Sequence, residues 1–164
     1  MNRLALRIII VVAAIAIIAA CGYSIRHEPE IGSVRIGPIT NNTMEHGLED
    51  MMTDTLALHL MRSGIRIDEA SEYAITGTID DYTLTATAES DGVATYYNVT
   101  IKGAFSLKKP DGTSGNLGST NAFIVSFSAD ADMQSLMSNR AAANRSVIDN
   151  MASDIVSGIE GALK

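Results

Sequence analysis

The chain of 164 residues is acidic, with 12 lysines and arginines against 19 aspartates and glutamates and a formal net charge of −7. Nucleic-acid binding requires a basic surface, so this balance of charge argues against it. The chain has no tryptophan and only 5% aromatic residues, which argues against a platform on which bases or sugars stack.

The first 21 residues have the pattern of a bacterial lipoprotein signal. Arg3 and Arg7 precede an apolar run over residues 8–20, and small residues lead directly to Cys21. The run matches the apolar core of a signal peptide, whereas a membrane-spanning helix needs about 20 apolar residues. We therefore predict cleavage before Cys21 and acylation of its thiol. The alternative is a short anchor helix that is never cleaved.

Cys21 is the only cysteine in the chain, so no disulfide partner exists within it. Acyl chains contribute about 0.8 kcal/mol for each buried methylene, so several chains on this residue would hold the protein on a membrane surface. Gly22 follows the cysteine, and the lack of an aspartate there favours, by analogy with bacterial lipoproteins, the outer membrane with the body in the periplasm. The predicted division is a signal peptide at 1–20, a lipid-anchored tether at 21–32 and a single domain at 33–164.

The predicted domain begins with a strand and a helix. Residues 33–39 alternate apolar and polar side chains, and Pro38 marks the end of this strand. Asn42 is the predicted helix cap, with Glu45 as its capping-box partner three residues later. The helix then runs to Gly64, which can take the positive φ of a helix end. Its apolar stripe recurs every four residues, at Leu48, Met52, Leu56 and Leu60.

Most of the predicted sheet comes after a short extended segment at 65–67. Residues 73–88 form a long strand in which the apolar positions change from odd to even numbers at Asp80-Asp81. Side chains of a strand alternate with a period of two, so this change of phase predicts a β-bulge or a break at that point.

The strands that follow are predicted to be joined by tight turns. A turn at 89–92 leads to the most regular alternation in the chain, at 97–108. The Lys-Pro-Asp-Gly sequence at 109–112 predicts another turn, and 113–118 is expected to be a small polar loop. A last strand is predicted at 120–128. Strands joined in this way pair antiparallel.

The tail from 135 to 163 is predicted to be a second amphipathic helix. Two such helices need a surface to cover, so we predict an α+β fold: a two-layer sandwich with a mostly antiparallel sheet of about four strands and both helices on one face. The other face carries Asn, Thr, Lys and Ser and meets either solvent or a partner. Five methionines are interpreted as gap-filling core: Met51, Met52, Met133, Met137 and Met151.

No arrangement of residues predicts catalysis, a metal site or a cofactor. The three histidines lack metal-ligand spacing, and His59 is interpreted as a satisfied histidine near the core. Asp80-Asp81 and the aspartates of 130–132 are better explained by a bulge and a turn than by paired carboxylates or metal ligands. No nucleophile elbow is present, and acylation would remove the thiol of Cys21.

The remaining candidate site is basic. Lys102 and Lys108 share the polar face of one predicted strand, and Lys109 begins the turn after it. In an acidic protein they form a local positive spot. They either discourage aggregation at a solvated edge or bind an anionic headgroup or a carboxylate-rich partner. Arg62 and Arg66 would add to this spot if the fold brings them close.

An ordered set of segments resembles the LPS-assembly lipoprotein family of the LptE type. The matching segments are Cys21-Gly22-Tyr23, the strand and Asn-rich stretch 34–43, Gly47-Leu48-Glu49 with Gly64, the strand 73–79 and the final amphipathic helix. The chain departs from the usual family character in being more acidic and less aromatic.

This resemblance implies a non-enzymatic protein that plugs the lumen of the outer-membrane β-barrel LptD and helps deliver lipopolysaccharide to the outer leaflet. It implies contacts of the polar sheet face with the barrel wall, and of Lys102, Lys108 and Lys109 with anionic sugar or phosphate. Two alternatives stay open: a lipoprotein adaptor of another envelope assembly or secretion system, and an envelope hydrolase that uses acidic residues such as Asp80 and Asp81.

Overall fold

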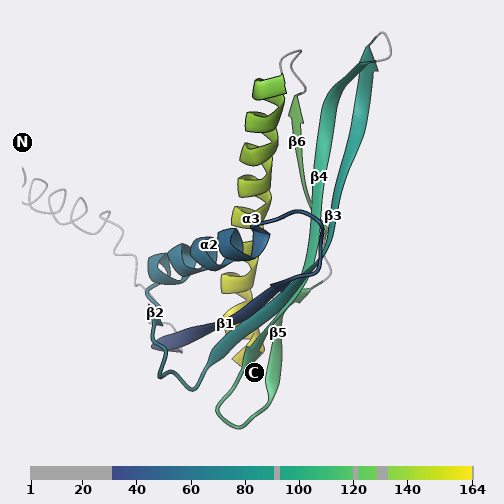
Figure 1. Ribbon diagram of the computed structural model, residues 1–164. Helices are drawn as coiled ribbons and strands as arrows, with labels where there is room; N and C mark the ends of the chain where they lie inside the picture. The colour runs from purple at the N-terminus through teal and green to yellow at the C-terminus, as the bar shows by residue number, and fades with distance from the viewer. Residues whose placement is uncertain (1–30, 91–92, 120–121, 129–132, 164) are drawn as a thin grey trace, which may run out of the picture.

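The structure is a computed structural model that describes residues 31–90, 93–119, 122–128 and 133–163. Over these residues a mixed sheet of six strands packs against two helices (Figure 1). The predicted α+β sandwich is confirmed, with more strands than the four or so predicted. Some predicted features lie wholly or partly outside the described residues: the signal peptide with Cys21 and its tether, the turn at 89–92, the beginning of the strand at 120–128, and the aspartates of 130–132.

The sheet is built around one long antiparallel pair. β3 (Ala74–Ser90) pairs along nearly its whole length with β4 (Val93–Lys108), as the tight turns predict. On the other side of β3, β1 (Ser33–Asn41) runs parallel to it, and β2 (Arg66–Ile67) is parallel to β1 at that edge of the sheet. The order is β2-β1-β3-β4, so the parallel strands occupy one side of the sheet.

Two short strands share the opposite edge of β4. β5 (Ser114–Ser119) pairs with residues 104–108, and β6 (Phe123–Ser128) pairs with residues 96–101. The two strands therefore lie one after the other along β4 and not side by side (Figure 1). As a result, β6 lies along the half of the long β3–β4 pair that is away from β1 and β2. We call this half of the fold the distal half.

The predicted bulge in β3 is confirmed. Ile79 pairs with Gly103 while Asp81 pairs with Lys102, so Asp80 is an extra residue on β3. The insertion returns the apolar residues to the helix-covered face, because Ile79 is fully buried and Tyr82 packs against the same core. The change of phase seen in the sequence is therefore a bulge within one continuous strand.

The hairpin from β4 to β5 turns at the predicted residues. The Lys109 amide donates to the Thr113 carbonyl at 2.8 Å, Gly112 has a φ of 82°, and Asp111 accepts from the Thr113 amide at 2.8 Å. The prediction of a polar loop at 113–118 is wrong, because β5 occupies this segment. The Gly and Asn residues of β5 are typical of loops, so the sequence does not indicate a strand there. Leu117 is the buried apolar side chain of this strand.

α2 (Leu48–Arg62) buries the predicted stripe of Leu48, Met52, Leu56 and Leu60. Its predicted beginning is wrong: Gly47 is the N-cap, with a φ of 80° and no side-chain cap. Asn42 donates to Asp80 at 3.0 Å, and the Glu45 carboxylate reaches the other helix. The end is confirmed, since Gly64 has a φ of 84°.

α3 (Met133–Leu163) lies along β4, β5 and β6 on the same face as α2. Near its end a Cβ on Gly115 would lie 2.4 Å from the Ala162 carbonyl oxygen, and a Cβ on Gly158 would lie 2.9 Å from that of Leu117. This part of the helix therefore approaches the sheet more closely than any side chain would allow.

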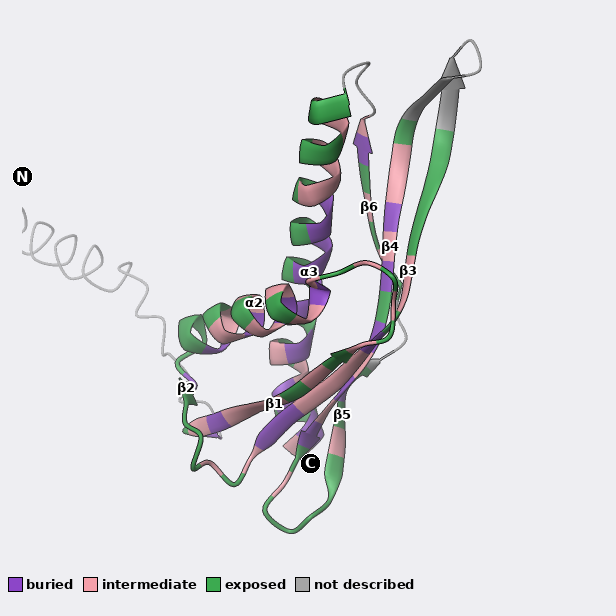
Figure 2. Ribbon diagram, in the orientation of Figure 1, coloured by how far each residue is buried: buried purple, intermediate pink, exposed green. Residues whose placement is uncertain are grey.

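The core lies between the helices and the sheet (Figure 2). Met52 and Met151 belong to it, as predicted. The same prediction is wrong for Met133 and Met137, which are 69% and 66% exposed. Both lie at the beginning of α3, so the distal part of the fold is less completely covered than the rest.

Candidate functional site

The sheet face opposite the helices is lined by small polar side chains. On β4 the residues Ile101, Gly103, Phe105 and Leu107 are buried against the helices, and the residues between them face the other way. The predicted polar face is thereby confirmed. Its members on β3, β4 and β6 include Thr76, Thr78, Thr83, Thr85, Asn98, Thr100, Ser106 and Ser126.

This face, which we call the outer sheet face, holds a shallow hollow of about 680 Å³. Thr40 of β1 borders it, Thr76 and Ser106 line its middle, and Asn116 of β5 lies on the far side. None of the lining residues is charged. Hydroxyl and amide groups can both donate and accept hydrogen bonds, so the hollow suits an uncharged polar surface.

The structure separates the three candidate lysines. The Lys102 ammonium lies 3.2 Å from the Asp81 carboxylate, and both side chains are about half exposed. Lys108 is exposed at the end of β4, six residues and therefore roughly 20 Å further along the strand. Lys109 follows it at the turn. Only Lys108 and Lys109 form a local pair, and the charge of Lys102 is opposed by Asp81.

The two arginines do not extend this pair. Arg66 lies on β2, with β1 and β3 between it and β4, and Arg62 ends α2 on the helix layer. Asp111 lies near Lys109 in the turn. The Thr113 hydroxyl, followed by the Thr113 amide, lowers the pKa of the Asp111 carboxyl, and Lys109 lowers it by less.

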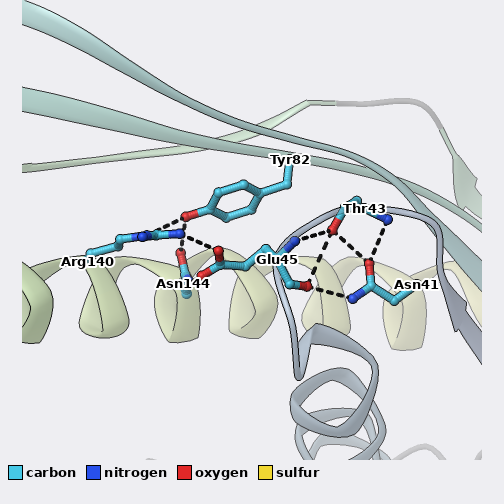
Figure 3. A network of polar contacts seen from close by, with 6 residues as sticks. All are labelled: Asn41, Thr43, Glu45, Tyr82, Arg140 and Asn144. Carbon is cyan, nitrogen blue, oxygen red and sulfur yellow. Dashed lines mark hydrogen bonds and ion pairs between the residues drawn. The ribbon is translucent and has the colours of Figure 1, made fainter.

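A polar network that the sequence did not predict connects the sheet, α3 and the loop before α2 (Figure 3). The Glu45 carboxylate pairs with Arg140 and accepts from the Asn144 amide at 3.1 Å. The Tyr82 hydroxyl accepts from Arg140 Nε at 3.1 Å and donates to Asn144 Oδ1 at 3.2 Å. The Tyr82 hydrogen bond raises the pKa of Arg140 further above its ordinary value, at which the guanidinium is already charged.

Asn41 extends this network to the beginning of α2. Its Oδ1 accepts from the Thr43 amide at 3.0 Å, and its Nδ2 donates to the Glu45 carbonyl at 2.7 Å and to Glu49 at 2.8 Å. The donors and acceptors satisfy one another even at Asn144, which is only 6% exposed. We interpret the network as a structural connection that fixes the loop before α2. Its one signal in the sequence is a polar pair, Arg140 and Asn144, spaced four residues apart on a helix.

The acidic pair at the bulge does not form a paired-carboxylate site. Asp80 accepts from Asn42 and from Thr78, each at 3.0 Å, whereas Asp81 pairs with Lys102. His59 lies 2.8 Å from Asp149 on α3 and is 17% exposed, as expected for a satisfied histidine near the core. Across the described residues, no group of three or more His, Cys, Asp or Glu side chains is placed to hold a metal ion.

Neither α2 nor α3 is long and apolar enough to cross a membrane, and these are the helices of the described part of the chain.

Comparison with known proteins places this geometry in context. The model of the LptE family, described as lipopolysaccharide-assembly, matches residues 31–159. A minor lipoprotein from Acinetobacter baumannii is similar in structure, with 14% identity, a TM-score of 0.52, and coverage of 79% of this chain and 91% of that one. The rare lipoprotein B from Shewanella oneidensis has 11% identity, a TM-score of 0.52, and coverage of 77% and 94%. No curated protein matches.

The two structural similarities, at such low identity, show a shared fold. The family match carries more, because it spans most of the chain and includes the whole sheet, α2, and α3 as far as Ile159. The chain therefore belongs to the LptE family of lipopolysaccharide-assembly lipoproteins, which have a non-enzymatic role.

Proposed function

We propose that acylated Cys21 anchors this protein to the periplasmic side of the outer membrane, where its body plugs an LptD-type β-barrel. In that position it helps the barrel assemble and deliver lipopolysaccharide to the outer leaflet. The proposal includes a signal peptide at 1–20, a tether at 21–32 and a single domain at 33–164. The observation that carries it is the family match over residues 31–159.

The outer sheet face supports the role of a plug. The interior wall of an outer-membrane barrel is polar, so a body that fills it needs a polar surface. The hollow between Thr40 and Asn116 has an uncharged lining of small side chains, which suits contact with such a wall. The proposed interface is this face.

The tether length supports attachment close to the membrane. Ile31, only 2% exposed, begins the packed body and lies 10 positions after Cys21. Ten residues span at most roughly 35 Å when fully extended. An acyl anchor at Cys21 would therefore keep the body next to the membrane surface without any spanning helix.

The experiment for this proposal isolates the tagged full-length protein from outer membranes and weighs the complex by native mass spectrometry. We expect acyl chains on Cys21 and a co-isolated barrel larger than the protein itself. The Cys21→Ala variant should be absent from the outer-membrane fraction, because it lacks the acyl anchor. A protein without acyl chains, or one isolated with other envelope machinery and no barrel, would contradict the proposal.

The lysines are proposed to contact anionic sugar or phosphate of lipopolysaccharide. Because Asp81 opposes Lys102, we expect most of the effect from the pair at the turn. Lys108→Glu with Lys109→Glu should weaken lipopolysaccharide binding by about tenfold, while Lys102→Glu should change it less. Unchanged binding in the double variant, with an unchanged melting temperature, would eliminate the lysine contact.

A further inference from the structure

One edge of the sheet is open at β6. This strand pairs with β4 from Phe123 to Ser128, and no other strand of the described residues pairs with its second side. Figure 1 shows β6 at the border of the sheet, beside the first turns of α3. An unpaired strand edge presents backbone donors and acceptors that another chain can bind.

The register indicates which backbone groups face outwards. In an antiparallel strand, alternate residues direct both the N–H and the C=O to the same side. The Ser128 carbonyl accepts from the Asn139 amide of α3 at 3.1 Å, so it points away from β4. By alternation Ile124 and Ser126 also direct their backbone groups to the open side, while Val125 pairs with Val99 of β4.

A trough of about 330 Å³ runs between this edge and α3. Val125 and Phe127 contribute its sheet wall, and Ala142 and Ser146 contribute its helix wall. The helix residues are small and exposed, so they leave room for side chains that another strand would bring. A groove between a strand edge and a helix is a recurrent site for the addition of an extended peptide.

Nothing in β6 protects this edge. Exposed edges in native proteins commonly carry a lysine, a proline or a bulge that prevents pairing with another chain. Residues 123–128 contain no charged residue and no proline, and their pairing with β4 is regular. The edge at β5 differs, because the backbone of α3 lies against Gly115 there.

We propose that the open edge of β6 binds an extended segment of the partner barrel by strand addition. The segment is uncharged and has apolar side chains at alternate positions, which enter the trough. The proposal rests on the proposed function. It is favoured by charge, since the trough has no charged lining residue in a chain of net charge −7. That net charge opposes close association of two copies, so a second copy is a poorer occupant.

The first test removes the backbone N–H of Ser126, which faces the open side of β6. Its control loses the same side-chain contact but keeps the N–H. Ser126→Pro deletes the N–H, and Ser126→Ala keeps it. Both variants lose the hydrogen bond from Ser126 Oγ to Asn98 Oδ1, which measures 2.6 Å. Because the N–H faces away from β4, both should keep their fold, which a melting curve checks.

The second test fills the trough from the helix side. Ala142→Trp places a large ring in it, and Ser153→Trp adds the same ring at an exposed position of α3 that does not line the trough. Each variant is expressed as the tagged full-length protein, and the barrel recovered with it from outer membranes is quantified. The oligomeric state of each purified variant is measured by sedimentation.

A hydrogen bond contributes about 0.5–1.5 kcal/mol, so Ser126→Pro should recover about two- to twelvefold less barrel than Ser126→Ala. Ala142→Trp should show a similar loss relative to Ser153→Trp. Equal recovery within both pairs, with the wild type binding the barrel, would overturn this inference and leave the proposed function standing. Recovery of no barrel by the wild type would overturn both. A wild-type dimer that Ser126→Pro dissociates would overturn the inference in favour of a second copy.

Discussion

The two halves of α3 meet the sheet in different ways. Towards the C-terminal end, Ala162 lies against Gly115 and Gly158 lies against Leu117, with distances that exclude any Cβ. At the N-terminal end, Met133 and Met137 are more than half exposed, and a trough separates the helix from β6. One helix therefore combines a closely packed end with an end whose surface remains available.

The difference indicates which part of the molecule is fixed and which part can receive a partner. The closely packed half holds α2, β1, β5 and most of the fully buried side chains, as the purple segments of Figure 2 show. The distal half holds the open edge of β6 and part of the outer sheet face. A plug needs both properties, because it must keep its shape while its surface contacts another protein.

The largest expected effect compares one leucine in each half, both on the helix-covered face of the sheet. Leu107 is fully buried, whereas Leu84 is 39% exposed in the distal part of β3. Leu107→Ala should lower the free energy of unfolding by about 3 kcal/mol because it leaves a cavity, and Leu84→Ala should lower it by about 1 kcal/mol. Urea denaturation measures both. Equal losses would show that the two halves are packed alike.

The next effect concerns Glu45, which connects the loop before α2 to α3. Glu45→Ala leaves the Asn144 amide without this acceptor and removes the partner of Arg140. We expect a loss of about 2 kcal/mol, since a buried polar group without a partner costs about 1–3 kcal/mol. A double-mutant cycle with Asn144→Ala should give a coupling of about 1 kcal/mol. Additive losses would mean that the two residues stabilise the fold independently.

A pair of glycines tests the close approach directly. Gly158→Ala places a methyl group against the backbone of Leu117, so it should destabilise the protein by about 1 kcal/mol despite the better helix propensity. A Cβ on Gly161 would meet no neighbouring group within 4 Å, so Gly161→Ala should stabilise the helix by about 0.5–1 kcal/mol. Thermal melting distinguishes the two signs, and stabilisation by both would contradict the close packing.

The smallest effect is a change in acid sensitivity at the beginning of α2. A backbone hydrogen bond at Glu49 itself, and then the Asn41 side chain, lower the pKa of the Glu49 carboxyl below its ordinary value of 4.5. The folded state therefore favours the charged form, so this contribution is present above pH 4.5 and is lost as the pH falls through the lowered pKa. Glu49→Gln should lose less stability between neutral and acid pH than the wild type. An identical pH profile would show that the contacts of Glu49 contribute nothing.

Local patterns predicted the fold well where one element alone determines the outcome. The phase change at Asp80-Asp81 predicted a bulge or a break, and the structure has the bulge. The spacing of Leu48, Met52, Leu56 and Leu60 predicted a helix with a buried stripe. Features that depend on distant residues were missed. Glu45 resembles a capping-box residue in the sequence, yet its partner Arg140 is 95 positions away.

The same dependence on distant residues explains what was missed about the candidate site. The sequence of β5 has a low propensity for strands. The strand forms because β4 pairs with it and α3 covers it at Gly115. Lys102 and Lys108 share a strand face, as predicted, but the ion pair of Lys102 with Asp81 depends on the register set by the bulge. The open edge of β6 could not be predicted from the sequence, because it depends on the order of all the strands in the sheet.

Site-specific photocrosslinking in intact outer membranes tests the central claim most directly. The crosslinker is placed at Thr85, an exposed position of the outer sheet face, and in a matched variant at Asp54, an exposed position of α2. If the outer sheet face meets the barrel wall, Thr85 should give an adduct with the barrel in higher yield than Asp54. An adduct from Asp54 with none from Thr85 would contradict the account.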